Sequence, residues 1–152
     1  MFTPFEPKTN NRFILYIDGI ESYLINTSTL PSIDNGEIKI EYINVDFRVK
    51  AKSTWNAISI TMYDPVDPTG AAMVHDWLDI HHKSDNGVDG YAFDEYKKDI
   101  DLKYLDPKGS EFQGWKIYGA YMQDINWGSM DWAGGDAVSI DVTLAYDYAR
   151  LI

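Results

Sequence analysis

The feature that most constrains the fold is a two-residue alternation near the end of the sequence, in the stretch AVSIDVTLAYDYA. Every second residue from Val138 to Tyr148 is aliphatic or aromatic. Successive side chains of a β-strand point to opposite faces of a sheet, so this period predicts a strand with one apolar and one polar face. Such a strand is stable only where a core covers its apolar face.

Five other segments show strand patterns. The stretch RFILYIDGIESYLIN, residues 12–26, holds two apolar runs around Asp18-Gly19, a dipeptide favoured in two-residue turns, and this predicts a hairpin. Residues 37–43 and 57–63 alternate apolar and polar side chains, and we expect these two strands to pair with each other. Their side chains expected in the core are Ile38, Ile40, Ile58 and Ile60. Residues 97–106 and 114–127 predict two further strands.

One segment has a convincing helical pattern. Thr69 is a candidate N-cap for GAAMVHDWLDIHHK, residues 70–83. The side chains that share one stripe of this helix are Val74, Trp77, Leu78 and His81. Residues 84–96 are polar and rich in glycine, which is typical of a long loop. Many strands and one flanking helix predict a mainly β fold, a two-sheet antiparallel sandwich or barrel. We expect residues 1–152 to form a single domain, with 1–11 as an N-terminal extension.

Charge and composition exclude several classes of protein. The formal net charge of -11 repels phosphate, which disfavours a nucleic-acid-binding protein. The sequence has no cysteine, so disulfide frameworks and thiolate zinc sites are excluded. No stretch approaches the roughly 20 apolar residues of a membrane span, and the first residues lack the pattern of a secretory signal. We therefore expect a soluble product that is not secreted.

The stretch HDWLDIHH holds the best candidate for a metal site. On a helix, His75, Asp79 and His82 stand at i, i+4 and i+7 and share one face, as the ligands of a metal-dependent hydrolase would. The stretch lacks the H-E-x-x-H order of zinc protease helices. Polar outer faces of amphipathic helices are far commoner than metal sites, so we interpret this face as solvent-exposed and expect no metal.

Other candidate chemistries have weaker support. The stretch DNGVDG, residues 85–90, suggests a calcium loop, but Gly87 and Tyr96 stand where oxygen ligands are needed. The sequence lacks the G-x-S-x-G, P-loop and dinucleotide-binding motifs, so we expect neither catalysis nor a cofactor. A carbohydrate-binding β-sandwich is an alternative, because several aromatic residues together would make a platform for sugar stacking. These residues are Trp115, Trp127, Trp132, Tyr118 and Tyr121.

Read in order, several stretches resemble the tail tube proteins of contractile-tailed bacteriophages, which are related to the inner tube proteins of contractile injection systems. The matching stretches are TSTLP (27–31), TWNAISITMYD (54–64), VHDWLDI (74–80), YKKDIDL (96–102), GWKIYGAYMQDINWGSMDW (114–132) and VSIDVTLAYDYA (138–149). The resemblance extends from about residue 12 onwards. It departs from the family pattern at Met130, where leucine is usual, and between Ile33 and Lys52, where only the alternation matches.

The resemblance implies a structural virion protein that assembles as hexameric rings stacked into a tube. Its partners would be further copies of itself together with tail sheath and baseplate proteins. Genomic DNA would pass through the lumen without specific binding during ejection. The protein would be made in the host cytoplasm and located in the virion tail. Two alternatives share the fold: a tube-initiating baseplate component, and the inner tube of an injection system.

This interpretation assigns roles to three groups of residues. The residues expected to face the lumen are Glu37, Lys39, Glu41, Ser59 and Thr61. The residues expected at contacts between subunits or rings are Phe47, Arg48, Lys50, Lys52, Tyr91, Phe93 and Tyr96. The residues expected on the outer face, toward a sheath, are His75, Asp76, Asp79 and His82. A lumen without clusters of lysine and arginine would let DNA slide, because each phosphate contact adds affinity.

Overall fold

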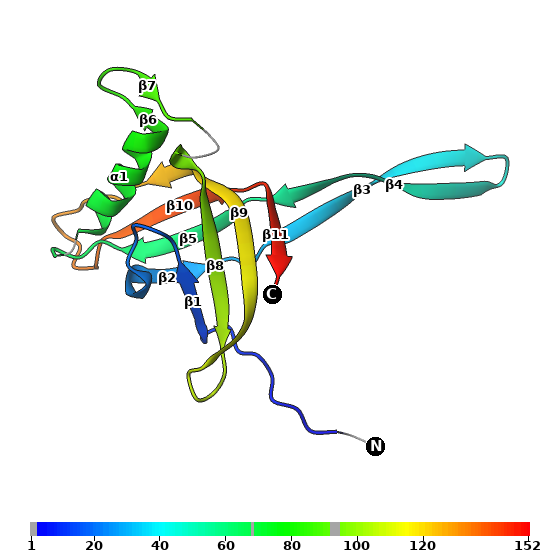
Figure 1. Cartoon of the computed structure of the whole chain (residues 1–152), viewed down its shortest axis with the longest axis horizontal. Helices are drawn as coiled ribbons and strands as arrows, with labels where there is room; N and C mark the ends of the chain where they lie inside the picture. The colour runs from blue at the N-terminus through cyan, green and yellow to red at the C-terminus, as the bar shows by residue number, and fades with distance from the viewer. Residues whose placement is uncertain (1–2, 68, 92–94) are drawn as a thin grey trace.

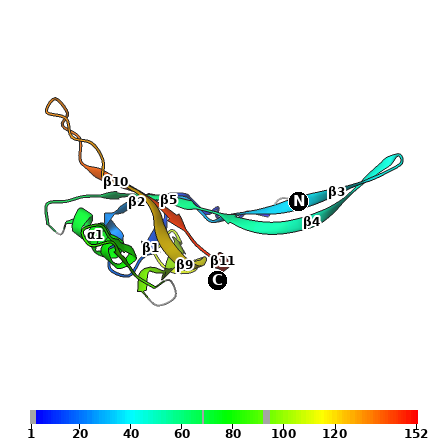
Figure 2. The same cartoon turned by 90° about the horizontal axis from the view of Figure 1, so that it is seen from above.

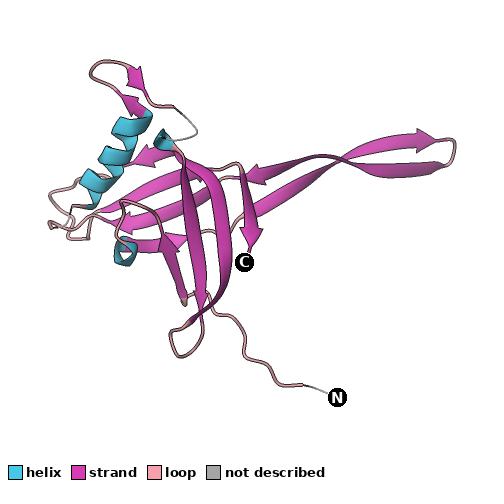
Figure 3. Ribbon diagram, viewed as in Figure 1, coloured by secondary structure: helices cyan, strands magenta, loops and turns pink. Residues whose placement is uncertain are grey.

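The computed structural model describes residues 3–67, 69–91 and 95–152. It is mainly β, with antiparallel sheets and one α-helix (Figures 1 and 3), which confirms the predicted fold class. The strands before the helix are β1 (Phe13–Tyr16), β2 (Ile25–Ser28), β3 (Ser32–Tyr42), β4 (Val45–Asn56) and β5 (Ile58–Tyr63). The helix is α1 (Gly70–His81), and a short 3-10 helix, η1, spans Ser22–Leu24. The later strands are β6 (His82–Lys83), β7 (Val88–Asp89), β8 (Lys98–Leu105), β9 (Glu111–Asn126), β10 (Ser139–Ala145) and β11 (Tyr148–Leu151).

The largest sheet is organised around the long strand β9. This sheet has seven strands in the order β1-β8-β9-β10-β5-β2, and β11 also pairs with β9. The first part of β9 pairs with β8 and β11, and the second part pairs with β10. Gly119 lies between the two parts with a φ of +68°, a conformation that favours glycine. β9 therefore joins two half-sheets, one containing β1, β8 and β11 and the other β10, β5 and β2 (Figure 1).

The buried hydrophobic side chains form one cluster, to which both half-sheets and α1 contribute. Ile58 and Ile60 of β5 are buried, as predicted, and they face Leu144 and Val142 of β10. Figure 2 shows α1 on one side of the β10-β5-β2 half-sheet. Val74 and Trp77 of the predicted helical stripe are buried, and Leu78 packs against the cluster.

The helix begins and ends differently from the prediction. Thr69 makes no side-chain cap, and its hydroxyl donates to the carbonyl of Val66 instead. Asp64 accepts a hydrogen bond from the backbone N–H of Ala71 at 3.0 Å and so supplies the missing cap from the preceding turn. The helix ends at His81 and not at residue 83, because His82 and Lys83 pair with β7. Residues 84–96 are therefore not simply a loop, since they include β7.

We predict that replacing Asp64 with alanine lowers the free energy of unfolding by about 1 kcal/mol, because a helix N–H loses its acceptor. The matched control is Thr69→Ala, which removes no bond to a helix N–H and should have a smaller effect. Urea unfolding of the unassembled protein measures both. Equal losses in the two variants would contradict the capping role of Asp64.

The predicted N-terminal hairpin is wrong in its pairing. The turn forms at Asp18-Gly19, where Gly19 has a φ of +86° and an isolated bridge joins Ile17 to Ile20. The flanking strands then separate: β1 pairs with β8, and β2 pairs with β5. The local turn signal was sound, but the strands that follow it find partners far away in the sequence.

The strands β3 and β4 form a separate two-stranded hairpin that projects from the body of the molecule (Figures 1 and 2). Its ladder runs from Ser32 opposite Asn56 to Tyr42 opposite Val45. The expected pairing of residues 37–43 with 57–63 is therefore wrong. The expected burial of Ile38 and Ile40 is also wrong, since these side chains are 53% and 45% exposed.

The C-terminal alternation forms two strands instead of one. Ile140, Val142 and Leu144 of β10 are buried as predicted, but the chain then bends at Tyr146-Asp147 into β11. There Ala149 is buried and Tyr148 is exposed, so the alternation has shifted by one residue. The shift arises because β10 and β11 pair with different parts of β9.

Candidate assembly surfaces

One face of the β10-β5-β2 half-sheet is polar, and α1 does not cover it. Thr61 lies opposite Asp141 and Thr27, and Asp141 in turn lies opposite Asn126. In the next row, Thr143 lies between Ser59 and Asp124. Residues directly opposite each other in antiparallel strands share a face. We call this set, which contains no lysine or arginine, the polar sheet face: Thr27, Ser59, Thr61, Asp124, Asn126, Asp141 and Thr143.

The polar sheet face includes two of the residues predicted to line a lumen. Ser59 and Thr61 both lie on it, and the hydroxyl of Thr61 donates to Oδ1 of Asp141 at 3.1 Å. The alternation around Ile140 already indicates that Asp141 and Thr143 point away from the core. Their position beside Ser59 and Thr61 depends on the pairing of β10 with β5, which separates the partners by about 80 residues and leaves no local signal.

The projecting hairpin has one charged and one apolar face. Ion pairs join Lys39 to Asp46 at 3.3 Å and Arg48 to Glu37 at 3.9 Å. The cross-strand register defines the charged hairpin face as Glu37, Lys39, Glu41, Asp46, Arg48 and Lys50. The apolar hairpin face on the other side consists of Ile38, Ile40, Tyr42, Val45, Phe47 and Val49. The structure thus brings the predicted lumen residues of β3 to the same face as Arg48 and Lys50, two predicted interface residues. Phe47, a third predicted interface residue, lies on the other face of the hairpin.

Of the other predicted interface residues, Lys52 lies on the hairpin and the described remainder lie away from it. Tyr91 is exposed just after β7. Tyr96 stacks on His81 with ring centroids 4.4 Å apart, and its ring edge meets Tyr121 at 5.8 Å. Lys52 lies at the irregularity in the β3-β4 ladder. Phe93 falls outside the described residues. The predicted interface set therefore divides between the hairpin and the C-terminal end of α1.

Two histidines on the outer side of α1, one on the helix and one just beyond its end, each contact an aspartate. Nδ1 of His75 lies 3.3 Å from Oδ2 of Asp79, and Nδ1 of His82 lies 2.5 Å from Oδ1 of Asp89 on β7. His82 is thereby held with β7, beyond the end of the helix, so the three side chains of the predicted ligand set do not converge. Among the described residues, no group of three or more histidine, aspartate or glutamate side chains could hold a metal ion.

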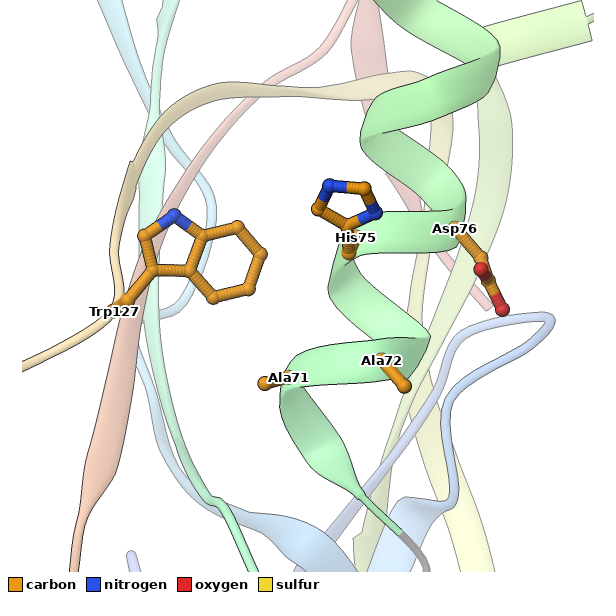
Figure 4. A pocket seen from close by; sticks show the side chains of 5 residues that line it. All are labelled: Ala71, Ala72, His75, Asp76 and Trp127. Carbon is orange, nitrogen blue, oxygen red and sulfur yellow. The ribbon is translucent and has the colours of Figure 1, made fainter.

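A shallow pocket of about 480 Å³ lies beside the same helix. Its lining consists of Ala71, Ala72, His75, Asp76 and Trp127. The indole of Trp127 lies beside His75, with ring centroids 6.2 Å apart, whereas Asp76 points away from it (Figure 4). This pocket has no cluster of convergent polar groups, which a small-molecule site needs for orientation.

The aromatic residues proposed as a sugar platform do not form one. Trp115 points toward the core side of β9, and its Nε1 donates to the hydroxyl of Tyr104 at 3.1 Å. Tyr118 points to the opposite face, where it stacks on Tyr148 at 4.6 Å. Trp132 is fully exposed in the loop between β9 and β10. Rings on opposite faces of one strand cannot stack on the same sugar chain.

Two lysines at the start of β8 anchor neighbouring elements. Nζ of Lys98 lies 4.8 Å from the ring centroid of Trp77 and donates to the carbonyl of Asp18 at 2.6 Å. Burial lowers the pKa of Lys98. Lys97 donates to Asp147 at 2.9 Å, and this hydrogen bond raises the pKa of Lys97. These contacts tie β8 to the N-terminal turn, to α1 and to the bend before β11.

Comparisons with known proteins identify the fold. No protein-family model and no curated protein sequence matches this chain. Among solved structures, a chain of the sheath-tube complex of the PVC extracellular contractile injection system is 19% identical, with a TM-score of 0.76 and coverage of 96% of this chain and 91% of that one. A chain of the PVC sheath/tube terminator structure is also 19% identical, with a TM-score of 0.77 and 99% coverage of both chains.

A third relative comes from the tube-terminating cap of the anti-feeding prophage AFP, with 18% identity, a TM-score of 0.75 and coverage of 100% of this chain and 95% of that one. None of the described helices has the length and apolarity that a membrane crossing requires. The similarity covers nearly the whole of this chain and of each of the three similar chains. The chain therefore has the fold of the tail tube and tube-terminator proteins of contractile injection systems, in agreement with its resemblance to contractile tail tubes.

Proposed function

We propose that this chain is a tail tube subunit that assembles as hexameric rings, and that these rings stack into a conduit. The observation that carries this proposal is the apolar hairpin face, which is exposed in the single subunit. A two-stranded hairpin is marginally stable by itself in water, and a contiguous exposed apolar surface indicates a protein interface. Neighbouring copies would cover this face in an assembled tube. The role is structural, without catalysis.

The polar sheet face is the proposed wall of the conduit. It presents hydroxyl, amide and carboxylate groups and no lysine or arginine. DNA that slides past it would therefore meet no cation that binds phosphate, releases counterions and so adds affinity. Ser59 and Thr61 lie at its centre, beside Asp141 and Thr143. Glu37, Lys39 and Glu41 continue the lining in this proposal, on a charged hairpin face whose three acids and three bases balance. Genomic DNA is the proposed cargo during ejection from a virion tail.

The outer face of α1 is the proposed contact with a tail sheath. It presents His75, Asp76 and Asp79, and His82 lies just beyond the end of the helix on β6. The described residues from Asp64 to His82 contain four aspartates and no lysine or arginine. A basic partner surface would complement this charge. Sheath and baseplate proteins are therefore proposed partners in addition to further copies of the chain.

Electron microscopy of the concentrated, purified protein tests the assembly. Six-fold rings or tubes are the expected result. A 17.4 kDa monomer that persists at high concentration, together with retention on polysaccharide, would contradict it and favour the carbohydrate-binding alternative.

A second prediction tests the proposed wall. Tubes that carry Ser59→Lys with Thr61→Lys should form normally but retain nuclease-protected DNA when assembled in its presence, because two cations per subunit would contact phosphates. Increasing salt should release this DNA. The matched control is Ser84→Lys with Asn86→Lys, which adds the same charge in the exposed turn between β6 and β7. Equal DNA retention by both variants would place Ser59 and Thr61 outside the lumen.

A second candidate function is the inner tube of a contractile injection system with a protein cargo. The observation that favours it is that two of the three similar structures described above come from an extracellular contractile injection system. Particles purified from the source cell distinguish the two functions. Encapsidated DNA attached to the tubes would support a virion tail, and DNA-free particles with protein density in the lumen would support an injection system.

A further inference from the structure

The molecule has a second exposed apolar surface, at the opposite end of its long axis from the projecting hairpin. This is the loop of residues 127–138 between β9 and β10, here called the β9-β10 loop (Figures 1 and 2). We propose that the β9-β10 loop of one copy docks on the apolar hairpin face of the next copy, with Met130 and Trp132 against Ile40 and Phe47. This inference rests on the proposed self-assembly and names the surfaces that make one of its contacts.

The β9-β10 loop presents large apolar side chains to solvent. Met130 is 87% exposed and Trp132 is 106% exposed, the highest value among the large hydrophobic residues described. The loop is ordered by its own turn, in which Asp131 accepts hydrogen bonds from the backbone N–H groups of Ala133 and Gly134. Tryptophan anchors that fill apolar surfaces on a partner contribute much of the binding energy of protein interfaces. A fully exposed tryptophan on an ordered turn therefore fits a docking contact.

The apolar hairpin face offers a matching surface. Ile40 lies directly opposite Phe47, and Ile38 opposite Val49. Neighbouring strands lie about 4.8 Å apart, so these side chains form a continuous apolar strip. The rest of the body does not cover this strip, because its side chains, among them Ile38, Ile40 and Phe47, are exposed.

The charges near the two surfaces are complementary. Lys52, at the irregularity of the β3-β4 ladder, has no ion-pair partner within the described part of the chain. The β9-β10 loop carries Asp131 and Asp136, with no lysine or arginine and no ion pair among the described residues. Opposite charges flanking an apolar contact fix its register and disfavour other partners. A second copy of this chain supplies both the apolar surface and the charges that each end needs.

The two surfaces also have the geometry of a repeating contact. The loop and the hairpin lie at opposite ends of the long axis of the folded molecule. In the proposed contact, each copy uses its loop on one neighbour and its hairpin on another. Such a head-to-tail contact is heterologous, and it generates a closed ring or an open helical array. The contact is therefore compatible with a tube.

Disulfide trapping tests the contact, because the native sequence has no cysteine. The double variant Ile40→Cys with Met130→Cys, assembled under oxidising conditions, should give a ladder of covalent oligomers on a non-reducing denaturing gel. The matched control is Ile40→Cys with Val88→Cys, which places its second cysteine on exposed β7. It should stay monomeric on the same gel. Electron microscopy of wild-type and variant samples records assembly independently.

The outcomes separate this inference from the proposed function. A ladder in the first variant alone supports the contact. Tubes without a ladder overturn the contact and leave the tube function standing, whereas a wild-type protein that never assembles overturns both. A charge exchange gives a second measurement: Lys52→Glu should raise the protein concentration needed for assembly about threefold, an effect the size of one surface ion pair. Adding Asp136→Lys to the same chain, with Asp131 kept because its carboxylate orders the loop, should restore assembly, and a failure to restore it would contradict the docking.

Discussion

Replacing Ile40 and Phe47 together with aspartate is expected to abolish tube assembly. These residues are cross-strand neighbours at the centre of the apolar hairpin face. Two carboxylates there would be buried without partners in the assembled tube, which costs several kcal/mol per contact and is repeated by symmetry. The isolated subunit exposes both side chains to water. Its free energy of unfolding should therefore fall by only about 1 kcal/mol, the cost of two like charges directly opposite each other.

Sedimentation and electron microscopy measure the loss of assembly, and urea unfolding of the unassembled subunit measures stability. The matched control is Lys39→Gln with Arg48→Gln, the adjacent cross-strand pair on the charged hairpin face. It changes the net charge by the same two units but leaves the apolar face intact, so assembly should persist. Normal tubes from the Ile40 and Phe47 variant would show that this face is not an interface.

Replacing Trp77 with alanine is expected to have the largest effect on the stability of the subunit, a loss of about 3–5 kcal/mol. Trp77 is 1% exposed and joins α1 to the core. Its Nε1 also donates to the carbonyl of Tyr96 at 2.7 Å, and its ring lies under Nζ of Lys98. The substitution would leave a cavity, an unsatisfied carbonyl and a lysine without its aromatic neighbour.

The chain provides its own control for this change. Trp132→Ala removes the same side chain from a fully exposed position, so it should alter the free energy of unfolding by less than about 0.5 kcal/mol. Both variants are compared at a protein concentration below assembly, because assembly adds to apparent stability. Trp77→Phe should fall between alanine and the wild type, since it keeps ring volume but loses the hydrogen bond. Similar losses for Trp77→Ala and Trp132→Ala would contradict the core role of α1.

The local signals of the sequence predicted the elements well. Alternation located β5, β8, β9 and β10, and the helical stripe located α1, because backbone geometry sets these periods within a few residues. Turn chemistry located the bend at Asp18-Gly19. Thr69 was the wrong cap, because Asp64, six residues before the helix, accepts the hydrogen bond from the N–H of Ala71.

The candidate surfaces were less predictable. The charge pattern of β3 indicated a polar face but not its composition, because Arg48 and Lys50 join it only through the register of β4. The polar sheet face needed the pairing of β5 with β10. The exposed state of Met130 and Trp132 had no sequence signal, since tryptophan and methionine are more often found inside proteins than outside.

The sequence by itself located the core strands and the helix, and which face of each is apolar, because both follow from the spacing of side chains along a short segment. It did not predict β4, β6 or β7. Only the tertiary structure decided which apolar faces enter the core. Ile40 and Ile60 stand in equally regular alternations, yet Ile60 is buried in the sheet opposite Val142 and Ile40 is exposed on a hairpin that pairs only with itself among the described strands. The difference arises because burial depends on partners distant in the sequence, and an alternating pattern is the same whether its cover comes from the same chain or from another copy.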